Sequence, residues 1–121
     1  MLEITPAGFA CLEPDDDGFL AHANLFEAAD LATGDRGVDA GASAVRLAAA
    51  RRQRPRVLEE AKDLLADHAE VGSICRHDEP QGCGLPNGGT IATVLLDPGA
   101  GTMHVGHGPA CQAAFETVGV R

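Results

Sequence analysis

Arg76 lies at a boundary between two predicted elements, where an arginine can be held rigidly enough to do chemistry. It belongs to residues 71–78, which run Val-Gly-Ser-Ile-Cys-Arg-His-Asp. An amphipathic helix pattern precedes this stretch at residues 55–68, and an apolar strand pattern follows at residues 90–97. A guanidinium fixed between rigid elements can be aimed at a carboxylate or a backbone carbonyl. The alternative is an ordinary solvated or ion-paired arginine, because most charged residues are exposed.

Cys75 is the thiol whose neighbours could favour a thiolate. Arg76 and His77 follow it directly, and a reactive cysteine needs an electropositive setting or an adjacent base. The stretch has no oxyanion-binding pattern of its own, so the sequence favours a buried, unreactive cysteine. Cys11 has no feature that supports a reactive role.

Cysteine and histidine residues are numerous enough to raise the question of zinc. The candidate ligands are Cys75, His77, Cys83, His104, His107 and Cys111. Structural zinc sites usually place ligands in close pairs such as C-x2-C. Cys75-x-His77 and His104-x2-His107 are pairs of a kind, but the spacings as a whole do not match a structural zinc site. The sequence therefore predicts no metal site and no other cofactor, and surface positions for the histidines.

Asn24 follows His22-Ala23 at the end of a predicted short strand, residues 19–23. A side-chain amide in this position can donate a hydrogen bond to a developing oxyanion. The alternative is an asparagine that serves a turn.

Composition limits what the chain can be. It has 121 residues, 45% of them hydrophobic but only 3% aromatic, which suits one domain or part of one. The net charge of −9 argues against nucleic-acid binding, and the one basic run, residues 51–56, suits a helix C-terminus. No apolar stretch is long enough to span a membrane and no signal-peptide pattern is present, so we expect a cytoplasmic protein with reduced cysteines.

Two helices are predicted in the middle of the chain, after a first strand that turns near residue 8 and a polar loop at residues 27–41. Ser43 is the expected N-cap of a helix at residues 44–54. Pro55 is expected in the first turn of the helix at residues 55–68. That helix has one apolar stripe, formed by Val57, Leu58, Ala61, Leu64, Leu65 and His68. Gly72 is its expected stop signal.

The residue pattern in the last third of the chain predicts strands. Residues 90–97 form an unbroken apolar run, which predicts a strand covered on both faces. The turn that follows predicts a hairpin with residues 102–107, and residues 109–115 are expected to form a helical turn. Strands, two helices and strands again indicate an α+β fold over a single partial domain, residues 1–121.

Three stretches together resemble the acyl-coenzyme A:6-aminopenicillanic acid acyltransferase family. They are His22-Ala23-Asn24-Leu25-Phe26, then Ile74-Cys75-Arg76-His77, then residues 90–98 with the Gly108-Pro109-Ala110-Cys111 ending. This family belongs to the N-terminal-nucleophile hydrolases and is related to the choloylglycine hydrolases. The resemblance covers roughly residues 2–115 and the C-terminal portion of the family's domain. It implies part of a four-layer αββα sandwich.

The resemblance also implies roles for individual residues. Asn24 would be the oxyanion-hole donor, and Arg76 would orient the active site. His22, Phe26 and Cys75 would line the substrate site, and the Ser43-x2-Arg46 pair would be structural or pocket-lining. Ala23 stands where the family usually has Thr, and Leu25 stands where it has a second His.

The family's nucleophile is a cysteine freed at a new N-terminus by self-cleavage, upstream of everything in this chain. Gly82-Cys83 lies in the wrong place to supply it. The resemblance therefore implies the C-terminal part of an amidohydrolase or N-acyltransferase, inactive alone, that acts on a small amide or acyl-coenzyme A substrate. Its expected partner is a chain or segment that carries the N-terminal cysteine. Association of this chain into a homo-oligomer is a second possibility. The alternative function is a small acidic binding module, or a zinc-binding one.

Overall fold

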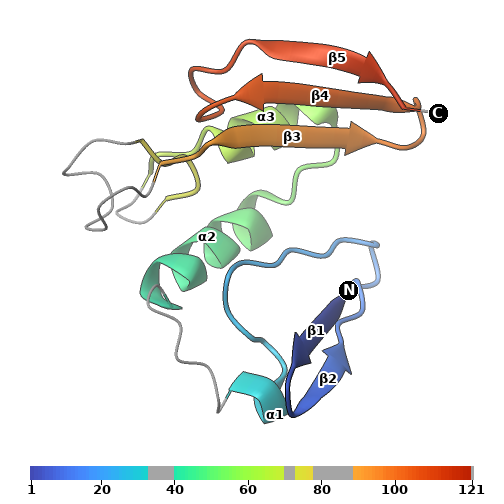
Figure 1. Cartoon of the computed structure of the whole chain (residues 1–121), viewed down its shortest axis with the longest axis vertical. Helices are drawn as coiled ribbons and strands as arrows, with labels where there is room; N and C mark the ends of the chain where they lie inside the picture. The colour runs from blue at the N-terminus through green and yellow to red at the C-terminus, as the bar shows by residue number, and fades with distance from the viewer. Residues whose placement is uncertain (33–39, 70–72, 78–88, 121) are drawn as a thin grey trace.

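The computed structural model describes residues 1–32, 40–69, 73–77 and 89–120, which form two antiparallel sheets and three helices. The mixed α/β class predicted from the sequence is therefore confirmed. The two sheets lie at opposite ends of the molecule, with α2 between them (Figure 1). The elements in chain order are β1 (Leu2–Thr5), β2 (Gly8–Cys11), α1 (Ala29–Ala32), α2 (Ala40–Gln53), α3 (Leu58–Leu65), β3 (Ala92–Asp97), β4 (Thr102–His107) and β5 (Phe115–Gly119).

The first sheet is a hairpin of β1 and β2. The predicted first strand is confirmed, while β2 was not predicted. The hydroxyl of Thr5 accepts hydrogen bonds from the backbone N–H groups of Ala7 and Gly8, which closes the turn between the strands. The predicted strand at residues 19–23 is wrong, since no strand in the described part of the chain pairs with it.

Helix α2 begins at Ala40, so the expected N-cap role of Ser43 is wrong. Ser43 is fully buried inside the helix, and its Oγ accepts a hydrogen bond from Nη2 of Arg46 at 2.8 Å. The helix is followed by Arg54, which has a left-handed φ of 45°. Its guanidinium binds Asp15 at 2.7 Å and Asp17 at 3.0 Å, and these contacts tie the loop after β2 to the end of the helix.

Helix α3 is shorter than predicted. Val57, at its N-cap, has an extended backbone, so Pro55 lies outside the first turn and that prediction is wrong. At the other end, His68 lies beyond the helix, so it is not part of the helical stripe. The polar loop predicted after Phe26 contains α1, and its residues 33–39 lie outside the described residues. The predicted stop at Gly72 lies outside them as well.

The second sheet has the order β3-β4-β5. The predicted hairpin is confirmed, with Val94 paired to Val105 and Leu96 to Met103. The expected helical turn at residues 109–115 is only a short turn, in which the N–H of Gln112 donates to the carbonyl of Pro109. From Phe115 onward the chain forms β5, which was not predicted.

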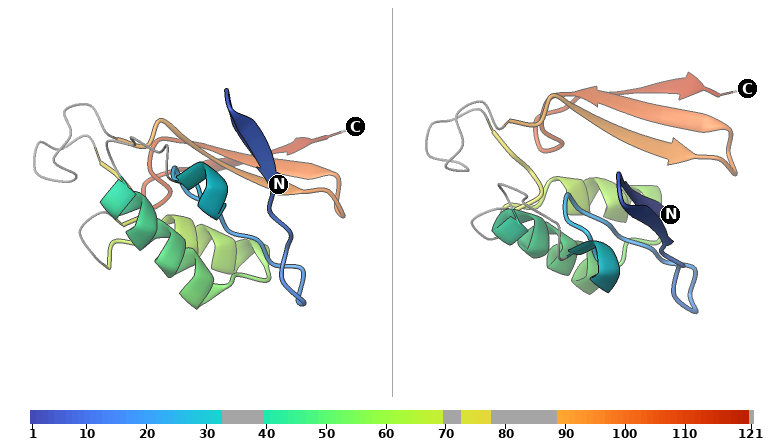
Figure 2. Two further views of the ribbon diagram at one scale, coloured as in Figure 1. Left: turned by 90° about the horizontal axis from the view of Figure 1, so that it is seen from below. Right: turned by 60° about the horizontal axis from the view of Figure 1, so that its bottom comes forward.

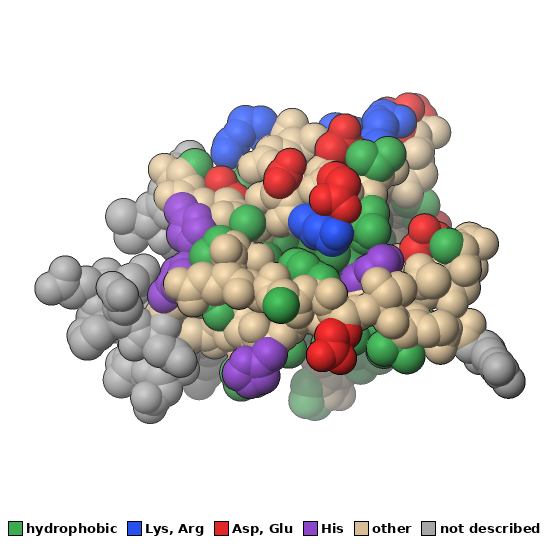
Figure 3. All heavy atoms as spheres, turned by 90° about the horizontal axis from the view of Figure 1, so that it is seen from above, with side chains coloured by type: hydrophobic (Ala, Val, Ile, Leu, Met, Phe, Trp, Pro, Cys, Tyr) green, Lys and Arg blue, Asp and Glu red, His purple; other side chains and the backbone are tan. Residues whose placement is uncertain are grey.

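Only one face of the second sheet is well covered. Helix α3 packs against β3 and lies on one side of the sheet (Figure 2). Thr93 is buried at 6% exposure, whereas Val94 and Leu96 are 50% and 64% exposed. Because successive side chains of a strand point to opposite faces, the prediction that both faces of this strand are covered is wrong. In the view of Figure 3, most Lys, Arg, Asp and Glu side chains lie along one edge of the molecule, and hydrophobic side chains reach the surface both among them and across the rest of this face.

The buried core of the described residues is small. Its hydrophobic members are Leu47, Ala49, Leu64 and Cys75. Within the described ranges, no helix combines the length and the apolar character that crossing a membrane requires.

Candidate functional site

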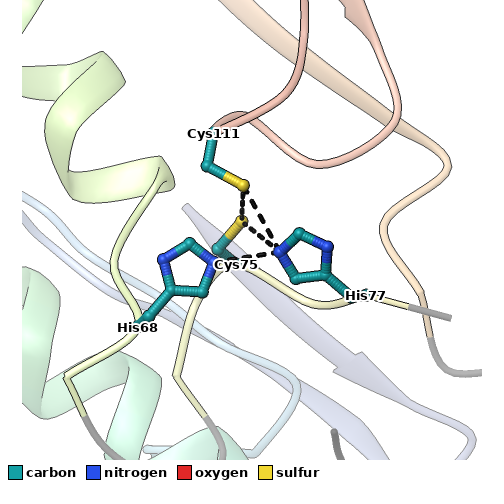
Figure 4. A group of neighbouring side chains, drawn as sticks. All are labelled: His68, Cys75, His77 and Cys111. Atoms are coloured by element: carbon teal, nitrogen blue, oxygen red, sulfur yellow. Dashed lines mark hydrogen bonds between the residues drawn. The ribbon is translucent and has the colours of Figure 1, made fainter. Parts of the chain in front are cut away.

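His68, Cys75, His77 and Cys111 converge on one point near the end of α3 (Figure 4). Each offers one nitrogen or sulfur atom, and these four atoms all lie within 4.8 Å of one another. The two Nε2 atoms of the histidines are 3.0 Å apart, and the two sulfur atoms are 3.5 Å apart. Nε2 of His77 is 3.8 Å from the sulfur of Cys75 and 3.3 Å from that of Cys111. We call these four residues the Cys/His cluster.

Backbone hydrogen bonds bring the first three members of the Cys/His cluster together. The chain leaves α3 through a turn in which the N–H of Asp67 donates to the carbonyl of Leu64. The N–H of Cys75 then donates to the carbonyl of Asp67 at 3.1 Å, which returns the chain to the end of the helix. This return places Cys75 next to His68, and His77 follows two residues later.

The second sheet positions the rest of the site. Thr90 donates its N–H to the carbonyl of Arg76 at 2.9 Å, and its hydroxyl accepts the N–H of Arg76 at 3.4 Å. Gly108, with a φ of 82°, donates to the carbonyl of Ile91 and accepts from the buried hydroxyl of Thr93 at 3.1 Å. The turn that follows Gly108 carries Cys111 to the other members of the Cys/His cluster.

The thiol of Cys111 is not set up as a nucleophile by the protein alone. Cys75 is 5% exposed. Burial raises the pKa of the Cys111 thiol, and the hydrogen bond from Cys75 raises it further. A nucleophilic cysteine needs the opposite shift, toward a lower pKa. The structure therefore gives no support to a thiolate nucleophile at Cys111.

Asn24 lies at the apex of a tight turn, in which the N–H of Leu25 donates to the carbonyl of Ala23 at 2.8 Å. Asn24 is exposed, so its amide is accessible to a ligand. Phe26, two residues later, lines a pocket of about 460 Å³ next to the β1–β2 turn. The other lining residues are Ile4, Thr5, Pro6, Ala7, Asp30 and Leu31.

His22 is bound to a buried carboxylate. Its Nε2 lies 2.9 Å from Oε1 of Glu3, which is 3% exposed. The same carboxylate accepts the backbone N–H groups of Glu27 and Ala28, at 2.7 and 2.9 Å. Burial raises the pKa of Glu3, but these hydrogen bonds outweigh it and leave the pKa below its ordinary value. An ionised Glu3 therefore anchors the segment between His22 and α1 to β1.

The residues singled out from the sequence are held by two separate sets of contacts. His22 and Phe26 are anchored around β1, with Asn24 between them, whereas Cys75 and Arg76 are anchored to the end of α3 and to Thr90. Sequence reasoning missed the role of His68, because the residue fitted the apolar stripe of a helix. The closely spaced Cys75-x-His77 pair was the one available signal. Cys83, another candidate ligand, lies outside the described residues.

A scan against protein-family models finds no match for this chain, and searches of curated proteins and of solved structures find no significant match either.

Proposed function

We propose that this chain is the C-terminal part of a cysteine N-terminal-nucleophile hydrolase, acting as an amidohydrolase or N-acyltransferase on a small amide or acyl-coenzyme A substrate. The proposal comes from the resemblance of three sequence stretches, and one structural observation supports it. The β3-β4-β5 sheet carries α3 on one face and exposes Val94, Leu96 and Val118 on the other. A sheet with a helix on one side and an uncovered apolar face on the other resembles one half of an αββα sandwich.

Asn24 is the proposed oxyanion donor. Its exposed amide at a turn apex can point at a substrate carbonyl without moving any packed element. The neighbouring pocket around Phe26, with apolar walls and one carboxylate from Asp30, suits a small acyl group or amide side chain. These contacts support a substrate site on the β1 side of the molecule.

Arg76 is the proposed orienting residue. The carbonyl of Arg76 accepts a hydrogen bond from the N–H of Thr90, and the N–H of Arg76 donates to the hydroxyl of Thr90. Because Thr90 lies shortly before β3, these two bonds hold the backbone of Arg76 at a fixed position. A guanidinium carried on a fixed backbone position can align a carboxylate or a carbonyl in the completed enzyme.

The nucleophile would be the N-terminal cysteine of another segment. Its thiolate would attack the amide carbonyl, its α-amine would carry the proton to the leaving amine, and Asn24 would donate to the oxyanion. The resulting thioester would be cleaved by water, giving hydrolysis, or by a second amine, giving acyl transfer. The residues of this chain would contribute binding and transition-state stabilisation.

Native mass spectrometry of the protein from its own source tests the proposal. We expect this sequence within a longer polypeptide or bound to a second one, with a mature N-terminal cysteine in either case. A lone folded monomer of 12.4 kDa would overturn it. In the assembled enzyme, Asn24→Ala should lower kcat by about 10²–10³-fold, whereas Cys11→Ser should leave it unchanged. An Asn24→Ala enzyme with normal acylation would exclude the role given to Asn24.

The second candidate is a small acidic binding module that never had a nucleophile. The Cys/His cluster favours it, because all four side chains come from this chain alone. A stable monomer in the native mass spectrum would support this second candidate.

A further inference from the structure

We propose that His68, Cys75, His77 and Cys111 bind one zinc ion. The inference rests on the arrangement of their four donor atoms (Figure 4). It holds whether the chain is part of an enzyme or a separate module, because all four residues belong to this chain.

Four distances within the Cys/His cluster lie near the edges of a zinc tetrahedron, and all four donor atoms lie within 4.8 Å of one another. With Zn–S bonds of about 2.3 Å and Zn–N bonds of about 2.05 Å, a regular tetrahedron has edges of about 3.8 Å between sulfurs, about 3.3 Å between nitrogens and about 3.6 Å between sulfur and nitrogen. The structure has 3.5 Å between the sulfurs and 3.0 Å between the nitrogens. The two measured sulfur–nitrogen edges at His77 are 3.8 and 3.3 Å.

The donor set indicates the metal. Two thiolates and two neutral imidazoles in a tetrahedral arrangement are typical of structural zinc sites, and an S₂N₂ set selects zinc over magnesium or calcium. Binding would release the two thiol protons to solvent, and the two thiolates would neutralise the +2 charge of the ion. A neutral complex suits a site in which Cys75 is buried.

A disulfide between Cys75 and Cys111 is the competing explanation. The two sulfurs are 3.5 Å apart, well beyond the bonded distance of about 2.05 Å. A disulfide would also give no reason for Nε2 of His77 to contact both sulfurs, or for Nε2 of His68 to lie 3.0 Å from Nε2 of His77. A metal ion accounts for all four side chains.

The zinc would hold three segments of the chain together. His68 follows α3, Cys75 and His77 lie in residues 73–77, and Cys111 lies between β4 and β5. The ion would therefore link the end of α3, through His68, to the turn between β4 and β5, through Cys111. Small domains with few buried hydrophobic residues commonly use a structural metal in this way.

Metal analysis of the full chain, purified without a histidine tag under reducing conditions, tests the proposal. We expect one zinc per chain, and one cobalt(II) per metal-free chain with the absorption bands of tetrahedral thiolate-bound cobalt. Cys75→Ser and Cys111→Ser should each abolish the thiolate-to-cobalt bands at a cobalt concentration that saturates the wild type. Cys11→Ser is the matched control, because Cys11 is an exposed thiol bound to Glu13, and it should behave as wild type.

Histidine variants complete the test. His68→Ala and His77→Ala should lose stoichiometric zinc after dialysis against a chelator, whereas His104→Ala should retain it, because His104 is bound to Thr117. Reduced wild-type protein that takes up neither zinc nor cobalt would overturn the proposal, even if the variants fail to fold. A Cys75→Ser, Cys111→Ser double variant that still binds one zinc would overturn it as well.

Discussion

The sulfur atoms of Cys75 and Cys111 lie 3.5 Å apart, although the two residues are 36 positions apart in the sequence. A shift of about 1.5 Å would bring them to bonding distance. We therefore expect mild oxidation of the metal-free protein to form a Cys75–Cys111 disulfide, with the loss of two hydrogens detected by intact mass and by peptide mapping.

Zinc should prevent this oxidation, because both sulfurs would be engaged by the ion. The same oxidant applied to zinc-loaded protein should leave the two thiols open to alkylation after chelation. Cys11 serves as the internal reference, since its thiol is exposed and lies outside the Cys/His cluster. Equal rates of disulfide formation with and without zinc would contradict the expected protection.

Gly106 permits a close approach in the second sheet. A Cβ at this position would lie 2.6 Å from Cβ of Ala113 and 3.2 Å from the ring of Phe115. Gly106→Ala should therefore lower the free energy of unfolding by about 1–3 kcal/mol, the usual cost of overpacking. Gly119→Ala, in β5 of the same sheet, has nothing within 4 Å of its added Cβ and is the control for chemical denaturation. Equal stabilities of the two variants would exclude this steric explanation.

The sequence predicted the elements whose signals are local. The apolar run that became β3, its hairpin with β4 and the amphipathic pattern of α3 are visible within a few residues, and all three are present. Strands β2 and β5 were missed because each is short and is defined by its pairing rather than by an apolar run. The strand predicted at residues 19–23 had a suitable pattern, but no strand of the described chain pairs with it.

The Cys/His cluster was hidden from the sequence for a different physical reason. Its members are brought together by hydrogen bonds, such as that from Cys75 to Asp67, and by the turn after Gly108. Such contacts leave no regular spacing, so His68 was interpreted as part of an apolar stripe. The oxyanion-hole role of Asn24 and the orienting role of Arg76 came from the family resemblance, and both roles remain predictions.

Glu3 should make stability depend on pH. Hydrogen bonds hold the pKa of its carboxyl below the ordinary value, despite burial, so the folded protein keeps Glu3 ionised at a lower pH than the unfolded chain does. The resulting stability is present above the unfolded pKa of about 4.3 and is lost as the pH falls through the folded pKa. Glu3→Gln should therefore lower Tm most at neutral pH, with a difference that shrinks in acid. Asp97→Asn, on the second sheet, is the control. A Tm difference between wild type and Glu3→Gln that grows in acid would contradict a lowered pKa of Glu3 in the folded protein.

The uncovered face of the second sheet should drive self-association of the isolated chain. Val94, Leu96 and Val118 are each about half exposed or more. Val94 pairs with Val105, and Met103 pairs with both Leu96 and Val118, so these five side chains lie on one face of the sheet. Apolar sheet faces of this kind mark association surfaces. Sedimentation velocity should show a concentration-dependent increase in mass, and a Val94→Thr, Leu96→Thr variant should shift the chain toward the monomer while keeping its strand propensity.

Val57→Thr is the matched control for this last prediction, because Val57 is 59% exposed but lies at the start of α3 rather than on the sheet. It should associate as the wild type does. If the wild-type chain stays monomeric at high concentration, the apolar face is not an association surface. That result would also remove the structural observation that supports a missing partner layer, and the separate-module function would then be preferred.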